Sequence, residues 1–304
     1  MTTTSYIEPH HITPATIRSL DYNRYLCSLF SPAHTQHALH VIISFYHEIA
    51  SIRDQVSDPT LGMIRLKWWK DELNDCFNDD KAPSSLSLTS HKHILLAELS
   101  TLQQHNILTK ESLPLLHNII SARENEFSTP TLPTLNALEE HCTQLSLPLF
   151  LLHWQLITKQ TTPDKVTKEA LEGIAKACCM VGLLQASHFY IQQGYHFFPA
   201  DLMSQHSLKM DRLGSPAFLT ASQRVVKAIH AQASVIMQKN ITAWNHIERY
   251  ERKKLSPVVL PAIIAKNHLQ NIKKQDYDVL TQTRSTLPLA IFLRLWNSNR
   301  RKLL

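Results

Sequence analysis

Some aspartates of this chain stand four residues apart, the spacing that places two carboxylates on one face of a helix. Two such pairs are Asp54 with Asp58 and Asp71 with Asp75. Carboxylates placed in this way can bind Mg²⁺, which activates a diphosphate as a leaving group. Asp58 precedes Pro59, so we expect it to cap the next helix, and the second pair lies in a charged segment typical of a solvated helix face. We therefore expect no metal site at either pair.

Two histidines, His47 and His188, could also bind a metal or contact a phosphate. The chain has 18 histidines, so a few are expected near any site by chance. For both residues we favour a hydrogen-bonded position in or beside a pocket over a role as metal ligand. No metal and no cofactor is expected.

Three cationic side chains, Arg53, Arg65 and Lys67, could bind an anion without a metal. Arg65 is the strongest of these candidates. The alternative is an ion pair between Arg65 and a carboxylate of the neighbouring helix, either Asp54 or Glu48.

Helical periodicity predicts the elements that carry these residues. Ser31 is a suitable N-cap with Pro32 in the first turn, and Asp58 with Pro59 repeats that opening. One face of the first helix is marked by apolar residues at spacings of three and four, namely Ala38, Ile42, Phe45, Ile49, Ile52 and Val56. In the next helix Leu61, Ile64, Trp68 and Leu73 are expected to mark the buried stripe. Further helices are expected at 90–105, 112–127, 134–159, 164–192, 217–249, 257–272 and 286–299.

The composition favours helix and a reducing compartment. Only five glycines occur among 304 residues, so few positions suit tight hairpins. The five cysteines are an odd number without Cys-x-x-Cys spacing, which predicts unpaired and mostly buried thiols. The N-terminus lacks the apolar core of a signal peptide, and no apolar run approaches the ~20 residues that cross a bilayer. We expect a cytoplasmic protein that associates peripherally with the inner membrane.

The positive charge of the chain is concentrated in its last part. The net charge is +6, yet the residues from Arg252 onward hold 11 Lys or Arg against two acids. The last 20 residues, 285–304, combine a leucine-rich helix with basic residues, as interfacial segments do. The candidates for membrane contact are Trp296, Arg300, Arg301 and Lys302. The alternative is a terminal helix packed on the domain, and no motif for nucleic-acid binding is present.

Three separated segments resemble one enzyme family. Residues 21–77 contain Phe45-Tyr46-His47-Glu48 and an Arg-x-x-x-Trp helix, and residues 182–202 end in Gly-x-x-Phe-Phe-Pro-x-Asp-Leu. A weaker match is the Leu-Glu-Glu-His-Cys run at 138–142. Together these segments resemble the squalene/phytoene synthase family over roughly residues 20–270.

The resemblance implies an all-α, single-domain helical bundle of the class I isoprenoid synthase type with a central cavity, spanning 1–304. Family members join two prenyl diphosphates head to head, using Mg²⁺ held by two Asp-x-x-x-Asp motifs. Aligned on this chain, those motif positions are Ala50 and Asp54 in the first segment and Ala186 and Tyr190 in the second. Asp54 alone is acidic, so we expect a catalytically inactive protein. The alternative is an active Mg²⁺-dependent prenyltransferase.

Within the family, the lost aspartates resemble a branch formed by the assembly factor of respiratory complex I and its bacterial relatives. That branch implies a membrane-associated factor whose partners are respiratory complex subunits and the inner membrane surface. The cavity would bind an isoprenoid, a quinone or a lipid. The candidate pocket residues are Tyr25, His47, Asp54, Arg65, His188 and Tyr190.

Overall fold

Side-chain caps set where several of the long helices begin. In the computed structural model, which describes residues 12–78, 93–128, 131–280 and 288–301, Asp58 accepts a 2.8 Å hydrogen bond from the backbone N–H of Thr60. Asp164 and Ser215 cap their helices in the same way. The capping role expected of Asp58 is thus confirmed. The elements are α1 (Pro14–Leu20), α2 (Tyr22–Ser28), α3 (Ala33–Gln55), α4 (Pro59–Cys76), α5 (Ile94–Gln104), η3 (Lys110–Ser112), α6 (Leu113–Ser128), α7 (Leu135–Thr158), α8 (Lys165–Gln192), α9 (Ala200–Gln205), η4 (Met210–Arg212), α10 (Pro216–Asn245), α11 (Arg249–Val259), α12 (Pro261–Lys274) and α13 (Pro288–Arg301).

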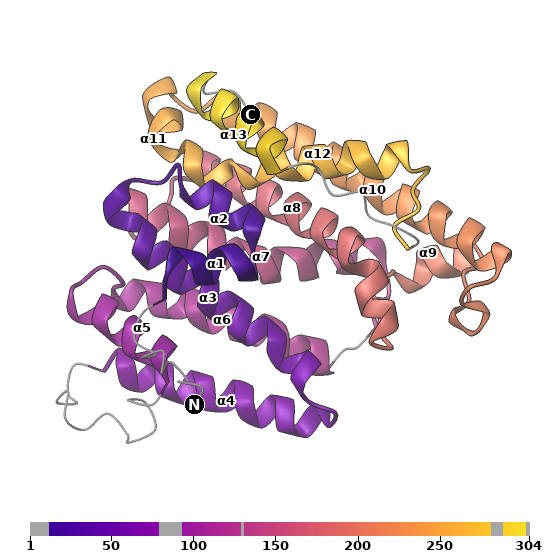
Figure 1. Cartoon of the computed structure of the whole chain (residues 1–304), viewed down its shortest axis with the longest axis horizontal. Coiled ribbons are helices and arrows are strands. Elements are labelled where there is room, and N and C mark those ends of the chain that lie inside the picture. The colour runs from indigo at the N-terminus through magenta and orange to yellow at the C-terminus, as the bar shows by residue number, and fades with distance from the viewer. Residues whose placement is uncertain (1–11, 79–92, 129–130, 281–287, 302–304) are drawn as a thin grey trace, which may run out of the picture.

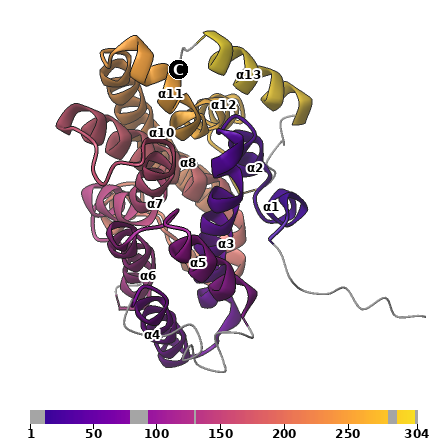
Figure 2. The same cartoon turned by 90° about the vertical axis from the view of Figure 1, so that its left-hand side faces the viewer.

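All the described regular structure is helical, and it is arranged around α8 (Figure 1). Helix α8 packs against α7, α10 and α12, and one cluster of buried side chains fills the space between them. A second cluster joins α3 to α4, α5, α6 and α7. A small third cluster connects α2 with α12 and α13 (Figure 2). That the chain forms one domain stays a prediction.

Three details differ from the sequence-based expectation. Helix α3 begins at Ala33, and the Ser31 hydroxyl lies 2.9 Å from Nε2 of His153 instead of capping the helix. Leu61 and Ile64 of α4 are exposed, because α4 turns Leu66, Trp69 and Cys76 towards the core together with Leu73, which was expected there. The segment before 257 forms a separate helix, α11, which continues through Pro257 and ends ahead of Pro261.

The buried face of α3 follows its predicted stripe. Ala38, Ile42, Phe45, Ile49 and Ile52 are all at most 2% exposed. Full burial of a large apolar side chain contributes roughly 1.5–3 kcal/mol to the stability of the fold. The five cysteines are free, with three of them buried, as their spacing predicts.

Helix α8 also meets the length and hydropathy criteria of a membrane span, unlike the expectation from apolar runs. It is 28 residues long, and half of its apolar window is buried inside the fold. Its packing against α7, α10 and α12 accounts for that apolarity, as in the core helix of a globular protein.

Candidate functional site

The positions aligned with the two acidic motifs lie on the last turns of α3 and α8. Ala50 and Ala186 are half-buried, Asp54 is exposed, and Tyr190 is half-buried. The Tyr195 hydroxyl, from the segment after α8, donates a 3.0 Å hydrogen bond to Oδ1 of Asp54. This bond joins the ends of the two helices, and it occupies the carboxylate of Asp54, the one acidic side chain among these four residues.

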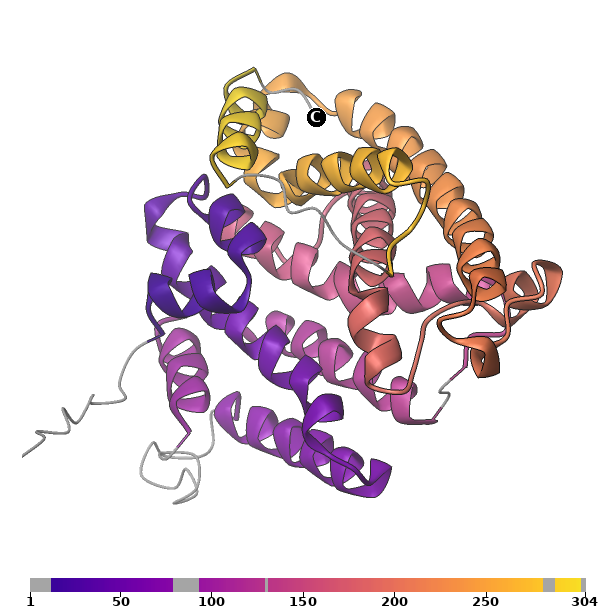
Figure 3. The same ribbon diagram turned by 45° about the vertical axis from the view of Figure 1, so that its right-hand side comes forward.

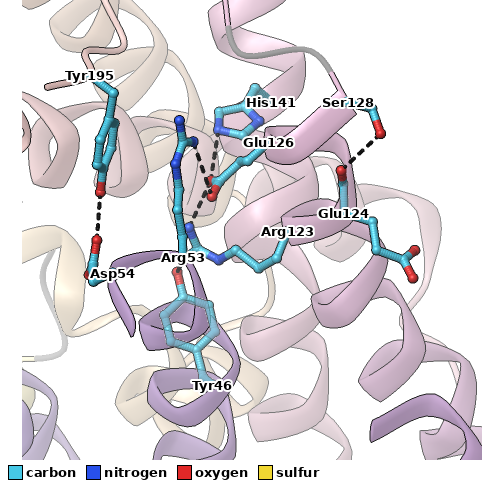
Figure 4. A network of polar contacts seen from close by, with 9 residues as sticks. All are labelled: Tyr46, Arg53, Asp54, Arg123, Glu124, Glu126, Ser128, His141 and Tyr195. Carbon is cyan, nitrogen blue, oxygen red and sulfur yellow. Dashed lines mark hydrogen bonds and ion pairs between the residues drawn. The ribbon is translucent and has the colours of Figure 1, made fainter. Parts of the chain in front are cut away.

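Beside this contact lies a buried ion network centred on Glu126 (Figure 4). The Glu126 side chain is 2% exposed, and its Oε1 lies 2.7 Å from Nη1 of Arg123 and 3.3 Å from Nε2 of His141. Its other oxygen lies 3.8 Å from Nη1 of Arg53. Helices α3, α6 and α7 each contribute to this network, which therefore fixes their relative positions.

The neighbours of Glu126 decide its ionisation. Burial by itself raises the pKa of this carboxyl, but Arg123, His141 and Arg53 outweigh burial and hold the pKa below its ordinary value. Burial likewise opposes the charge of Arg123, yet the carboxylate of Glu126 raises the pKa of the guanidinium. The network is therefore built from ionised groups, with the carboxylate of Glu126 facing the guanidiniums of Arg53 and Arg123.

Aromatic rings close the network on the side of α8. The guanidinium of Arg53 lies 4.0 Å from the centroid of the Tyr195 ring. The centroid of the Tyr190 ring lies 5.1 Å from that of Tyr195 and 5.0 Å from that of Phe197. Burial and the nearby carboxylate of Asp54 raise the pKa of Tyr195. Tyr195 is therefore a neutral hydrogen-bond donor at all ordinary pH values.

A second ion cluster lies at the start of α2. Oδ2 of Asp21 is 2.8 Å from Nη1 of Arg24 and 3.2 Å from Nε2 of His47. Burial raises the pKa of Asp21, but Arg24 and the hydrogen bond from His47 more than reverse this and hold the pKa well below its usual range. The ring of Tyr46 connects the two clusters, since Arg24 and Arg123 lie 4.7 and 5.7 Å from its centroid.

The guanidiniums and the carboxylates of the whole site are equal in number. Bound Mg²⁺ needs several oxygen ligands directed at one point, whereas each carboxylate here already faces a cation or a hydroxyl. Within the described ranges, no group of three or more His, Cys, Asp or Glu side chains could hold a metal ion. Three guanidiniums and three carboxylates make up the site, namely Arg24, Arg53, Arg123, Asp21, Asp54 and Glu126.

A pocket of about 180 Å³ lies between α2, α8 and α12, next to the Asp21 cluster. Its polar lining includes Asp21, Arg24, Gln185 and His268. An apolar cavity of about 30 Å³ shares Arg24 and Cys27 with it. Burial lowers the pKa of His268 to about 4, so this imidazole is neutral at pH 7, and its Nε2 is buried without a hydrogen-bond partner.

The predicted pocket residues are divided between three places. His47 reaches the pocket through Asp21, whereas Asp54 and Tyr190 lie beside the Glu126 network. Tyr25 packs between the second and third buried clusters.

Two of the candidates lie on the surface. Arg65 is exposed and donates a 2.9 Å hydrogen bond to Gln55, which is neither of its two expected partners. His188 is exposed and lies 2.9 Å from Gln192. Neither side chain lines the two cavities between α2 and α12, and a role for them in ligand binding stays a prediction.

Sequence reasoning did not select Arg24, Arg123, Glu126 or His141. An Arg and a Glu three residues apart, as in Arg123 and Glu126, are common on solvated helices. A usable signal is that both fall on the same helix face as Leu116, Ile119 and Ile120, at spacings of three, four and seven residues, and that this face is buried.

The membrane-contact candidates lie at the C-terminal end. Trp296 and Arg300 are exposed on α13, which itself packs on α11 and α12. Lys302 and the side chain of Arg301 lie outside the described residues. Contact with a membrane therefore stays a prediction, while the packing of the helix on the domain is observed.

Comparison with known proteins gives consistent matches. A family model described as squalene/phytoene synthase matches residues 17–290. The NADH dehydrogenase (ubiquinone) complex I, assembly factor 6, of Rattus norvegicus is 27% identical over 291 residues, which cover 92% of this chain and 80% of that protein. The Mus musculus protein of the same name is 25% identical over 292 residues, with the same coverage.

Among solved structures, a dehydrosqualene synthase in complex with a ligand matches with a TM-score of 0.71 at 15% identity, covering 95% of both chains. The expected all-α fold of the isoprenoid synthase type is thus confirmed.

Proposed function

The chain belongs to the squalene/phytoene synthase family, and we propose that it is a non-catalytic member that assists the biogenesis of respiratory complex I at a membrane. One observation carries the non-catalytic part of this proposal. At the end of α3, where the family's reaction needs metal-binding carboxylates, the chain has a buried ion network in which Glu126 faces Arg53, Arg123 and His141.

The chemistry of that network opposes diphosphate ionisation. Arg53 and Arg123 are cations that could in principle stabilise a leaving diphosphate, as arginine does elsewhere. Both are already paired with Glu126, and Arg53 also lies over the Tyr195 ring. A diphosphate would have to displace a buried carboxylate from its partners, and an unpaired buried charge costs several kcal/mol.

The assembly role rests on the relatives. Both curated proteins described above are complex I assembly factors, and this chain spans 80% of their length. We propose that the chain contacts subunits of the respiratory complex and works on the cytoplasmic face of the inner membrane. The exposed part of α13 supports membrane association.

The cavity limits what could bind inside the fold. A site for a drug-sized ligand encloses about 300–1,000 Å³, whereas the two neighbouring cavities measure about 180 and 30 Å³. An isoprenoid, quinone or lipid tail would fit there only if the surrounding side chains moved. We propose that such a ligand places a small polar head beside Gln185 and His268, whose buried Nε2 lacks a partner.

The second candidate function is head-to-head prenyl transfer with Mg²⁺, which the resemblance to squalene/phytoene synthases implies. Incubation of the purified protein with farnesyl or geranylgeranyl diphosphate and Mg²⁺ separates the two. We expect no pyrophosphate release above a protein-free control. Sustained release would overturn the non-catalytic proposal.

The assembly role has its own test. Deletion of the gene in the organism that carries it is expected to lower the level and activity of complex I, and the wild-type gene should restore both. Unchanged complex I after deletion would refute the assembly role, even if the protein proved inactive as a transferase.

A further inference from the structure

Helix α13 is apolar on two faces, and only one of them is used for packing. Ile291 and Leu295 are 7% and 0% exposed, and they contact the cluster that joins α2 and α12. On the other side Leu289, Leu293 and Trp296 are 68%, 52% and 46% exposed. Spacings of four and three residues place these side chains on one outward stripe. The packed face holds the helix so that this stripe points to solvent.

A basic groove adjoins the stripe. It encloses about 650 Å³ between α11, α13 and the start of α3. Its lining includes Tyr250, Lys253, Lys254 and Arg300, and no carboxylate lines it within the described ranges. Both lysines and Arg300 are exposed, and no ion pair with a carboxylate is found for them in the described part of the chain.

The groove and the stripe are continuous. The guanidinium of Arg300, which lines the groove, lies 5.3 Å from the centroid of the Trp296 ring in the stripe. Tyr250 is 71% exposed at the edge of the groove. Figure 3 shows α11, α12 and α13 together at one end of the molecule. Cations and exposed aromatic and aliphatic side chains therefore share one surface.

We propose that this surface, the α11–α13 face formed by Tyr250, Lys253, Lys254, Leu289, Leu293, Trp296 and Arg300, docks on an anionic lipid bilayer. The proposal rests on the proposed membrane association and assigns it to particular residues. The groove receives a lipid phosphate, while the three apolar side chains of the stripe enter the interfacial layer. Trp and Tyr are suited to that layer because their rings are apolar with a polar edge.

The combination of charges and apolar groups identifies the partner. A nucleic acid would use the cations but would leave exposed leucines in contact with water. An uncharged apolar partner would leave Lys253, Lys254 and Arg300 facing no counter-charge. An anionic bilayer offers phosphates to the cations and an apolar layer to the exposed leucines. Each Lys or Arg near its surface contributes about a five-fold gain in binding.

The test is co-flotation of the full chain with vesicles of phosphatidylcholine, with and without phosphatidylglycerol. We expect binding only to the vesicles that contain phosphatidylglycerol. The double variant Lys253→Glu/Lys254→Glu is expected to lower the partition coefficient at least about 25-fold, the product of two lysine contributions. The matched control is Lys209→Glu/Arg212→Glu, which makes the same charge change at η4, outside the α11–α13 face, and should bind nearly as the wild type does.

A second variant tests the apolar stripe. Leu293→Gln/Trp296→Gln changes two exposed side chains, so the protein should fold, as its far-UV circular dichroism and thermal unfolding will show. We expect this variant to lose most vesicle binding at every salt concentration, whereas the binding of the wild type falls as salt rises.

Three results would overturn the proposal. Equal losses in Lys253→Glu/Lys254→Glu and in the control would show that general charge, and not this face, drives binding; membrane association would then stand. Absence of binding to anionic vesicles would refute both the docking role of the α11–α13 face and the proposed membrane association. The outcome of the complex I deletion test would not be affected. Binding of inorganic phosphate without binding of vesicles would make the groove a site for a soluble anion.

Discussion

Replacement of Glu126 by Gln removes the charge at the centre of the buried network and keeps the size of the side chain. Glu126 is 2% exposed and has Arg123 at 2.7 Å, His141 at 3.3 Å and Arg53 at 3.8 Å. Removal of one member of a buried ion pair costs about 3–5 kcal/mol, because the remaining charges stay buried without compensation. Glutamine can still accept a hydrogen bond, so we expect a loss of about 3 kcal/mol in the free energy of unfolding.

The control lies two residues away on the same helix. Glu124 pairs with Lys70 at 2.5 Å, but the two side chains are 20% and 28% exposed. Glu124→Gln should therefore cost about 1 kcal/mol or less. Urea unfolding followed by circular dichroism measures both variants. Equal stabilities of the two variants would refute the idea that the network holds α3, α6 and α7 together.

Acid provides an independent check on the same residue. The pKa of Glu126 lies below its ordinary value of 4.5 in the folded protein, so the carboxylate stabilises the fold above that pH. This contribution is lost as pH falls through the folded pKa. The difference between wild type and Glu126→Gln should accordingly shrink at low pH, and a constant difference would contradict the assigned ionisation.

Three further outcomes are expected. Gly173→Ala should destabilise the protein by about 1–3 kcal/mol, because a Cβ there would meet a side chain of α10. Gly182→Ala has open space around it and should stabilise the protein by about 0.5–1 kcal/mol. Thermal unfolding that ranks the two variants the other way would contradict the α8–α10 contact. Burial lowers the pKa of His153 from 6.5 to about 3, so the unfolded chain takes up a proton first as pH falls. Between pH 7.5 and pH 5, the free energy of unfolding of wild type should therefore fall by about 2 kcal/mol more than that of His153→Gln, as measured by urea unfolding. Parallel pH curves for the two proteins would refute this. Tyr195→Phe keeps the ring over Arg53 but removes the hydrogen bond to the exposed carboxylate of Asp54. The variant should therefore lose only about 1 kcal/mol in the free energy of unfolding, as measured by thermal unfolding. A loss above about 3 kcal/mol would mean that this bond holds α3 to the segment after α8.

The sequence predicts the helices well because their signals are local. Caps such as Asp58 and the apolar spacing of α3 depend on neighbours within four residues, and the structure confirms both. Helix α4 shows where this reasoning fails. Its sequence carries two apolar stripes, and the choice of Leu66 and Trp69 over Leu61 and Ile64 depends on which face α6 covers.

The sequence shows which of the candidate site's positions lack a carboxylate, but it does not show which charged side chains the site contains. Ala50, Ala186 and Tyr190 can be recognised in the sequence as positions without carboxylates. The structure adds that Tyr190 lies beside Arg123 and Glu126, which come from a segment more than 60 residues away. Ion pairs between helices, such as that of Arg53 with Glu126, leave no local signal; the one hint is that Arg123 and Glu126 fall on the buried face of α6.

The sequence by itself determined the helical content, the buried face of α3, the unpaired cysteines and the basic character of the last segment. Tertiary structure alone decided that Arg53 and Arg123 converge on Glu126, and that α13 packs through Ile291 and Leu295 while Leu293 and Trp296 stay exposed. The physical reason is one of range. Backbone hydrogen bonds and side-chain spacing act within a turn or two of helix, whereas ion pairing and the choice of a buried face depend on groups that only the packing of distant helices brings together.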